Sequence, residues 1–443
     1  MELKAEDKAA NQPAWLEKAF ELITNEGEER SCRAISEDAC HEMPGNFFKN
    51  MLSGAASKLA EQLVSAGTTL PWIFSALGVP VSFTGVLVPI KDAGSLLPQL
   101  FVSAKIRAFS RRKWFWVFAA LFQSAMLVAM AFAVLLLTGA TAGLVILLSL
   151  LLFSVAGGVG SIAFSDVMAK TVSRGKRGQL LAFRASVGGV LSLAAGLYLY
   201  DVVAGTTHIG VYFWMIIISA ILWAFAAFSF ALIREEKGAT EGGKTPVKEL
   251  KDAWRVFRED QNLRRFIFTR GLLMAIPLSQ PFFIVLGQQQ IGSAASSLGI
   301  VVIAAGLANI ISSPFWGRFS DKSSRRMMRV VALMGIVNIL LMLSFSAWPD
   351  VIQNTFGFAF LLLLQVMAHA GARLSRKTYL VDFAPEKDRP SYVSLSNTAI
   401  GIFTLVAAAI GLLAGLFGIE LMLLLYAVLL LAAWFLAGKL KEV

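Results

Sequence analysis

Two adjacent charges, Lys91 and Asp92, interrupt a long apolar stretch and are the residues best placed to do chemistry. If a helix begins at Pro80, Lys91 lies about 16 Å along it, near the middle of a bilayer's hydrocarbon core. A charge at that depth costs roughly 2.5–3.5 kcal/mol on insertion scales, so it needs a partner or a role. Lys91 could hold an anionic group of a ligand or pair with another helix, and Asp92 could bind and release a proton. A purely structural ion pair is the competing interpretation.

A polar helix face in the stretch 355–380 is the second candidate. Gln365 and His369 are four residues apart, and Arg373 and Arg376 continue the same face. An imidazole titrates near neutral pH, but a histidine bonded to a neighbouring helix is an equal alternative. The two arginines fall near the helix end, where snorkelling to the membrane surface is the simpler interpretation. Other polar side chains in apolar stretches are expected to line a cavity or to bond between helices, namely Arg270, Gln280, Asn309 and Asn397.

Membrane-spanning helices must position these side chains. The 443 residues are 56% hydrophobic and 16% charged, whereas soluble domains carry roughly 25% charge. This composition excludes a soluble enzyme and a disordered or disulfide-built chain. We therefore predict an all-α membrane protein of twelve transmembrane helices, each about 20 residues or longer. The expected spans are 60–79, 80–103, 114–137, 141–165, 180–200, 211–233, 266–287, 296–316, 328–347, 355–380, 391–415 and 417–438.

Basic residues are spread unevenly over the predicted connections. The net charge is +11, and the connections at 105–113 and 170–184 are strongly basic. By the positive-inside rule these connections and both termini are cytoplasmic, so a multi-pass protein of the cytoplasmic (inner) membrane is expected. The excess charge is then an orientation signal, and nucleic-acid binding is not expected. The outer connections, which contain no Lys or Arg, lie near residues 78, 139, 205, 292, 349 and 418.

The chain divides into four expected segments. They are an acidic cytosolic N-terminal extension (1–55), a six-helix bundle (56–233), a cytosolic linker with an amphipathic helix (234–262) and a second six-helix bundle (263–443). The apolar stripe of the linker helix consists of Val247, Leu250, Trp254 and Phe257.

The N-terminal extension carries its own short pattern. Apolar residues between Trp15 and Ile23 recur at helical spacing and predict one amphipathic helix. Cys32 and Cys40 are expected to be reduced thiols in the cytosol. With His41 they do not match the spacing of a zinc site, so no metal and no cofactor is expected.

Two basic motifs recur at nearly the same offset in the two halves. Ser110-Arg111-Arg112 corresponds to Ser324-Arg325-Arg326, and Arg177-Gly178 corresponds to Arg389-Pro390. Each copy follows the matching even-numbered span, as an internal duplication of six spans would place it.

The segment 317–326 resembles the cytoplasmic loop signature of the major facilitator superfamily, a glycine and an aspartate followed by two basic residues. Gly317, Asp321, Arg325 and Arg326 match this signature, whereas Ser324 replaces its second glycine. The resemblance covers residues 55–443. It implies two six-helix bundles that rock around a central cavity, with the loop residues as a cytoplasmic latch.

A second element of the resemblance lies between spans 4 and 5. Asp166 followed by Arg177 and Gly178 is similar to the acid and Arg-Gly pattern of that family. The first-half copy of the loop signature departs from the pattern, with Ser103 and Arg107 in place of the glycine and the aspartate. Span 5 also lacks the proline of the family's antiporter signature.

Together these features predict a secondary active transporter that moves a small solute by alternating access. An anionic substrate, proton coupling, contact with membrane lipid and a monomeric state are further expectations. A lipid or amphiphile translocator and a membrane sensor that signals through its N-terminal tail are the alternatives. We expect no enzymatic activity, because the sequence has no Walker loop, GxSxG or HExxH motif.

Overall fold

The computed structural model describes residues 13–24, 32, 35–173, 175–202, 209–238, 255, 257–292, 295–320, 322–349, 352–385 and 389–442. Within these ranges every regular element is a helix, and no strand is present. Ten helical stretches there are long and apolar enough to cross a membrane. The expected all-α membrane class is therefore confirmed.

The first half of the fold follows two short N-terminal helices, α1 (Ala14–Thr24) and α2 (Glu37–His41). It consists of α3 (Met43–Leu63), α4 (Thr69–Ala76), α5 (Val81–Thr84), α6 (Leu87–Arg107), α7 (Lys113–Leu136), α8 (Gly139–Thr171), α9 (Arg177–Val202) and α10 (Ile209–Ala231). The second half consists of α12 (Gln261–Leu272), α13 (Ala275–Ile291), α14 (Ala295–Ser320), α15 (Ser324–Leu343), η2 (Phe345–Ala347), α16 (Thr355–Phe383), α17 (Arg389–Leu412), α18 (Ala414–Phe417) and α19 (Ile419–Gly438).

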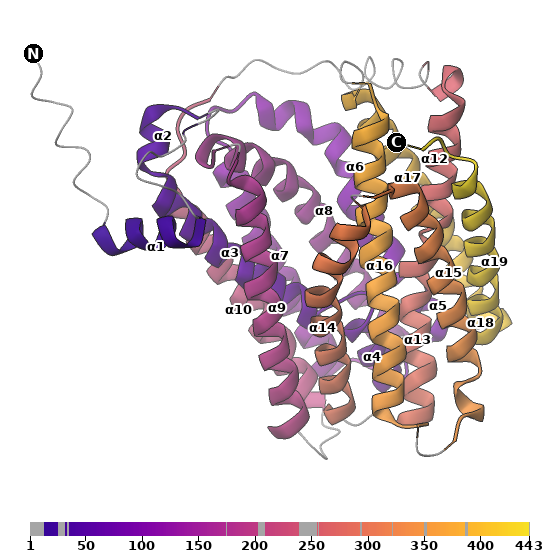
Figure 1. Ribbon diagram of the computed structural model, residues 1–443. Coiled ribbons are helices and arrows are strands. Elements are labelled where there is room, and N and C mark those ends of the chain that lie inside the picture. Colours follow the sequence, from indigo (N-terminus) through magenta and orange to yellow (C-terminus); the bar gives the residue numbers. More distant parts are fainter. Residues whose placement is uncertain are drawn as a thin grey trace, which may run out of the picture.

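The two halves stand side by side with their helices roughly parallel (Figure 1). The C-terminus lies on the same side of the molecule as α2, at the top of Figure 1, and we call this side the termini face. On the other side, the opposite face, helices turn sharply. Four glycines at these turns have positive φ angles, a conformation that side chains with a Cβ rarely adopt. They are Gly78 (64°), Gly139 (57°), Gly292 (87°) and Gly418 (83°).

Three of the expected spans are built from broken helices. The helix α12 stops three residues before α13, because Pro277 has no N–H to donate and fits only the first turn of a new helix. The spans predicted at 60–79 and 80–103 correspond to the pairs α3–α4 and α5–α6. These two pairs are not among the ten long apolar stretches of the described chain.

The predicted start of the first span was wrong, because α3 begins at Met43 rather than near residue 60. The expected boundary between extension and bundle, at residue 55, falls inside this helix. Its first part is polar but buried, with Asn46, Asn50 and Ser53 all fully inaccessible. Ser53 Oγ donates to the carbonyl of Ala226 in α10 at 3.0 Å. Hydropathy misses such a helix because its polar groups bond to other helices instead of water.

The prediction of two reduced thiols was also wrong, because Cys32 and Cys40 form a disulfide. Their Cα atoms lie 5.7 Å apart, within the range that a disulfide spans. The short helix α2 turns the chain back and brings the two residues together. The predicted N-terminal helix is present as α1. Of the linker's apolar stripe, only Phe257 is described, and it packs against the core; Val247, Leu250 and Trp254 lie outside the described residues.

Candidate functional site

A cavity of about 760 Å³ lies between the two halves. The first half lines it from α3, α6 and α9, and the second half from α13, α14 and α16. Its polar and charged lining includes Lys58, Glu61, Gln62, Ser65, Lys91, Asp92, Gln280, Asn309, His369, Arg373 and Lys377.

Lys91 and Asp92 lie side by side on α6 and both line the cavity. Each side chain is partly accessible, so neither charge is sealed in the helix packing. In the described chain no ion pair within 4.0 Å joins Lys91 to an acidic residue, so the salt bridge of the competing interpretation is not formed in this state. Both charges are therefore available to a solute in the cavity.

The polar face of α16 divides between two environments. His369 and Arg373 line the cavity, whereas Gln365 is fully buried in the helix packing of the second half. Gln365 Nε2 donates to Ile276 O and to Ser279 Oγ, each at 2.8 Å. Its Oε1 accepts from Asn338 at 3.0 Å. Gln365 thus joins α13, α15 and α16 and is a positioning residue outside the cavity.

The four remaining candidates also separate into two groups. Gln280 and Asn309 line the cavity. A Cβ added at Gly67 would come 2.9 Å from Oε1 of Gln280, so this side chain of α13 packs directly on the first half.

Arg270 and Asn397 do not line the cavity. The Arg270 guanidinium on α12 donates to Ser396 Oγ at 2.6 Å and to Asn397 Oδ1 at 3.0 Å on α17. These bonds hold the Arg270 guanidinium against α17 and outside the cavity lining.

Three charged lining residues were absent from the sequence-based candidates. Lys58 and Glu61 lie on α3, just before and at the start of the span expected at 60–79, and they pair with each other at 2.7 Å. Lys377 comes four residues after Arg373, so helical spacing from the predicted polar face could have identified it.

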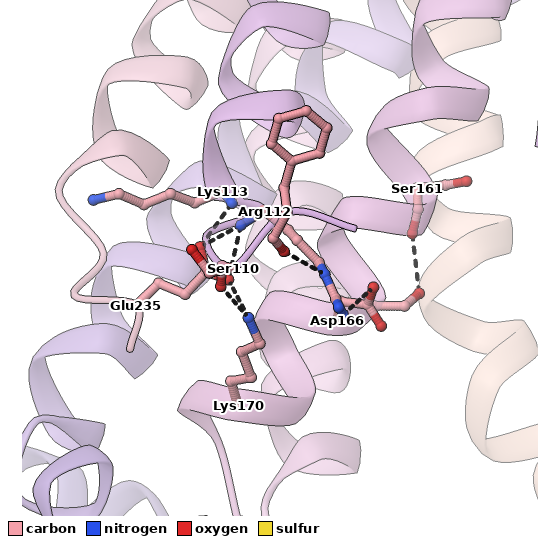
Figure 2. A network of polar contacts seen from close by, with 9 residues as sticks. Ser110, Arg112, Lys113, Ser161, Asp166, Lys170 and Glu235 are labelled. Atoms are coloured by element: carbon pink, nitrogen blue, oxygen red, sulfur yellow. Dashed lines mark hydrogen bonds and ion pairs between the residues drawn. The ribbon is translucent and has the colours of Figure 1, made fainter. Parts of the chain in front are cut away.

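A network of charges ties three elements of the first half together at the termini face (Figure 2). The Glu235 carboxylate, whose side chain is fully buried, accepts from the backbone N–H groups of Arg112 and Lys113 at 2.8 Å each. It also pairs with Lys170 Nζ at 2.8 Å. Arg112 Nη1 pairs with Asp166 Oδ2 at 2.9 Å. The end of α10 is thereby fixed to the α6–α7 loop and the last turns of α8.

The other latch candidates also bond within their own half. Arg177 donates to the carbonyls of Ala169 at 2.7 Å and Val172 at 3.0 Å, closing the turn from α8 to α9. A Cβ added at Gly178 or Gly317 would meet nothing within 4 Å.

At the corresponding turn of the second half, Arg325 pairs with Glu442 and donates to Leu440 O at 3.1 Å. The backbone N–H of Arg326 donates to Ser323 Oγ at 3.1 Å and so caps α15. Asp321 lies outside the described residues. In the described part of the termini face, none of these bonds joins the two halves.

The halves meet backbone to backbone toward the opposite face. A Cβ added at Gly85 would lie 2.5 Å from the carbonyl oxygen of Gly411, and one at Gly299 would lie 2.5 Å from the amide nitrogen of Tyr200. Gln288 Nε2 of α13 donates to the carbonyl of Trp72 in α4 at 3.5 Å. In contrast, the cavity lining reaches the exposed side chains of Lys58 and Lys377. The cavity is therefore closed toward the opposite face and open toward the termini face.

Comparisons with known proteins agree with this architecture. Residues 280–442 match the family model of the Major Facilitator Superfamily. An uncharacterised protein of Mycobacterium tuberculosis is 23% identical over 378 residues, which are 83% of this chain and 72% of that protein. The Staphyloferrin B transporter of Staphylococcus aureus is 26% identical over 168 residues, 38% of each chain.

Solved structures share the whole fold at low identity. The nucleoside transporter NupG has a TM-score of 0.69 at 13% identity, covering 89% of this chain and 99% of that chain. A D-xylose-proton symporter has a TM-score of 0.63 at 14% identity, covering 90% of this chain and 97% of that chain. The resemblance drawn from the loop motifs is thus confirmed.

Proposed function

Since this chain is a membrane transporter of the major facilitator superfamily, we propose that it is a secondary active carrier of a small polar solute and works by alternating access. The cavity between the halves is the observation that carries this proposal, because both halves line it and it opens toward one face only. Rocking of the halves would close the termini face and open the opposite face around a solute held at the centre. Transport then needs no chemical step on the solute.

The basic connections favour a cytoplasmic termini face, which makes the described state inward-facing. In this proposal α3–α4 and α5–α6 are the first two of twelve spans, and both termini are cytoplasmic. The absence of latch bonds across the described termini face is what an inward-open state requires. Contacts of the latch residues with the other half belong to the outward-facing state.

Asp92 is the residue we propose for proton coupling. Its carboxylate lines the cavity beside Lys91, and the positive charges of Lys91, Arg376 and Arg373 act on it. Protonation would remove the one acidic charge of the cavity that has no partner within 4.0 Å in the described chain. A proton and a solute could therefore compete for, or share, the same group of cations.

The polar lining favours a hydrophilic solute over a lipid or an amphiphile. A regulatory role for the N-terminal extension is the second candidate function. It is favoured by a contact with the bundle, because Lys176 Nζ, next to the start of α9, donates to the carbonyl of Thr24 at 2.7 Å. Removal of residues 1–31 deletes α1 and keeps α2, α3 and the bundle in the chain. A carrier keeps solute flux after this deletion, whereas a sensor loses its output.

The test is solute accumulation in proteoliposomes. Vesicles are incubated with a mixture of small metabolites, with and without a proton gradient, and their contents are identified by mass spectrometry. Protein-free vesicles are the control. We expect one class of small solute to enter only the vesicles that contain the protein. Equal contents in protein-containing and protein-free vesicles would contradict the proposal.

A further inference from the structure

We infer that the solute is an organic dianion, held by cations from both halves of the cavity; this inference rests on the proposed transport function and specifies its substrate. The charged lining consists of four cations, Lys58, Lys91, Arg373 and Lys377, and two acids, Glu61 and Asp92. The cavity therefore carries two uncompensated positive charges when both carboxylates are ionised.

The ion pairs of the structure show which charges are already satisfied. Lys58 and Glu61 neutralise each other at 2.7 Å. The remaining cations are Lys91 on α6 and Arg373 with Lys377 on α16, and the remaining acid is Asp92 on α6. In the described chain no ion pair within 4.0 Å includes any of these four residues. Three cations thus face one carboxylate across the cavity.

Two further arginines, Arg376 and Arg270, lie near this group of cations but outside the cavity lining. Arg376 directly precedes Lys377 on α16, and Arg270 of α12 and Lys58 of the first half lie within electrostatic range of Lys377. The guanidinium of Arg270 is held by hydrogen bonds to Ser396 and Asn397 of α17. Like charges gathered beside a low-dielectric wall repel one another and attract anions. An orientation signal alone does not explain the group, because Lys91 lies within the helix α6 and not in a connection.

Because these cations come from both halves, binding of a dianion should favour closure of the cavity. When the halves close over the cavity, water is expelled and every uncompensated charge loses its solvation. Two negative charges on the solute would balance the two positive charges of the lining, so the loaded cavity closes at a lower cost than the empty one. A dianion that touches Lys91 and Arg373 together also bridges the two halves. Substrate binding and the change of state are coupled by this neutralisation.

Carboxylates and phosphate monoesters share this chemistry, and the test separates them. Purified full-length protein in detergent is titrated at low ionic strength with succinate and with glycerol 3-phosphate, while thermal unfolding is recorded. Succinamide and glycerol are the matched neutral probes. A ligand that binds the folded state raises the apparent Tm, so one or both dianions should raise it and the neutral probes should not. Added salt should weaken the effect.

Charge variants of the lining give predictions of opposite sign. Lys91→Gln and Arg373→Gln should each weaken binding about tenfold to a hundredfold, because each removes a charge-assisted contact. Asp92→Asn should tighten binding, because it removes the one unpaired negative charge of the lining. Arg318→Gln is the control, since Arg318 is an exposed residue of α14 outside the cavity lining.

Absence of a Tm shift with both dianions overturns the inference, and so does unchanged affinity in Lys91→Gln. If that variant does not fold, weaker binding by Asp92→Asn overturns it independently. Accumulation of a neutral solute in the vesicle assay would refute the inference of a dianionic substrate but support the proposed carrier function. Binding of a dianion without accumulation of any solute would support the anion site and refute the carrier function.

Discussion

The glycine contact between Gly85 and Gly411 should control which face of the cavity is open. Replacement of Gly85 by alanine places a Cβ 2.5 Å from the carbonyl oxygen of Gly411, whereas ordinary contact begins at 3.4 Å. The neighbouring atom is backbone, so the halves must separate locally by roughly 0.9 Å or strain the turn. Overpacking of this kind costs about 1–3 kcal/mol. Because this cost falls only on the state in which the halves touch here, the equilibrium should move away from it by about 5- to 150-fold.

The assay follows a cysteine in the cavity. Asn309→Cys is made in a chain whose two native cysteines, Cys32 and Cys40, are serines, and it is labelled with a membrane-impermeant maleimide from the termini face. Gly85→Ala should label more slowly than the parent, because the open state is less populated. Gly210→Ala is the control, since an added Cβ there meets nothing within 4 Å. Equal labelling rates for the two alanine variants, in samples with unchanged Tm, would refute the reasoning.

Three further variants test the positioning contacts. Glu235→Ala should destabilise the protein by about 1–3 kcal/mol in chemical unfolding, because it removes the buried acceptor of the backbone N–H groups of Arg112 and Lys113. Asp166→Asn, on a partly exposed pair, should cost less than 1 kcal/mol, about the value of a surface ion pair; equal losses would be inconsistent with the network. Phe20→Ala removes a fully buried ring and should release α1, so a protease should cut the N-terminal extension faster. Trp15→Ala is the control, because the Trp15 side chain is 66% exposed. Identical cleavage rates in the two variants would show that Phe20 does not anchor α1. Gln365→Leu should lower stability by about 1–3 kcal/mol and leave dianion affinity unchanged; a large loss of affinity would place Gln365 in the binding site.

The long apolar helices could be predicted because length and hydropathy are properties of a local stretch of sequence. The span expected at 114–137 is α7, Lys113–Leu136, and the one expected at 417–438 is α19, Ile419–Gly438. The turn at Gly418 was also visible, since glycine accepts the positive φ angle that the turn requires.

The start of the first span could not be predicted from hydropathy. Ser53 is compatible with burial only because a carbonyl of α10 lies opposite it, more than 170 residues later in the chain. The same dependence on distant partners explains the glycine contacts at the opposite face. Nothing around Gly85 in the sequence shows that Gly411 will meet it.

The site itself was only partly visible. Helical spacing grouped Gln365, His369 and Arg373 on one face, yet Gln365 faces the helix packing and the other two face the cavity. Residues four apart drift by about 40° around a helix, so a face read over several turns spreads across two environments. Which part meets water depends on where the neighbouring helices stand. Lys91 was identifiable because a charge within a long apolar stretch is rare whatever surrounds it.

The most direct test of the central claim measures access to the cavity from both faces of the membrane. The cysteine at position 309 is labelled in vesicles of both orientations, with and without a transported solute and a gradient. In a carrier of the proposed kind, the cysteine is labelled from the cytoplasmic face in the absence of solute. It is labelled from the other face only when solute and gradient drive the change of state. Labelling from both faces at once would indicate an open channel, and labelling from one face under every condition would contradict alternating access.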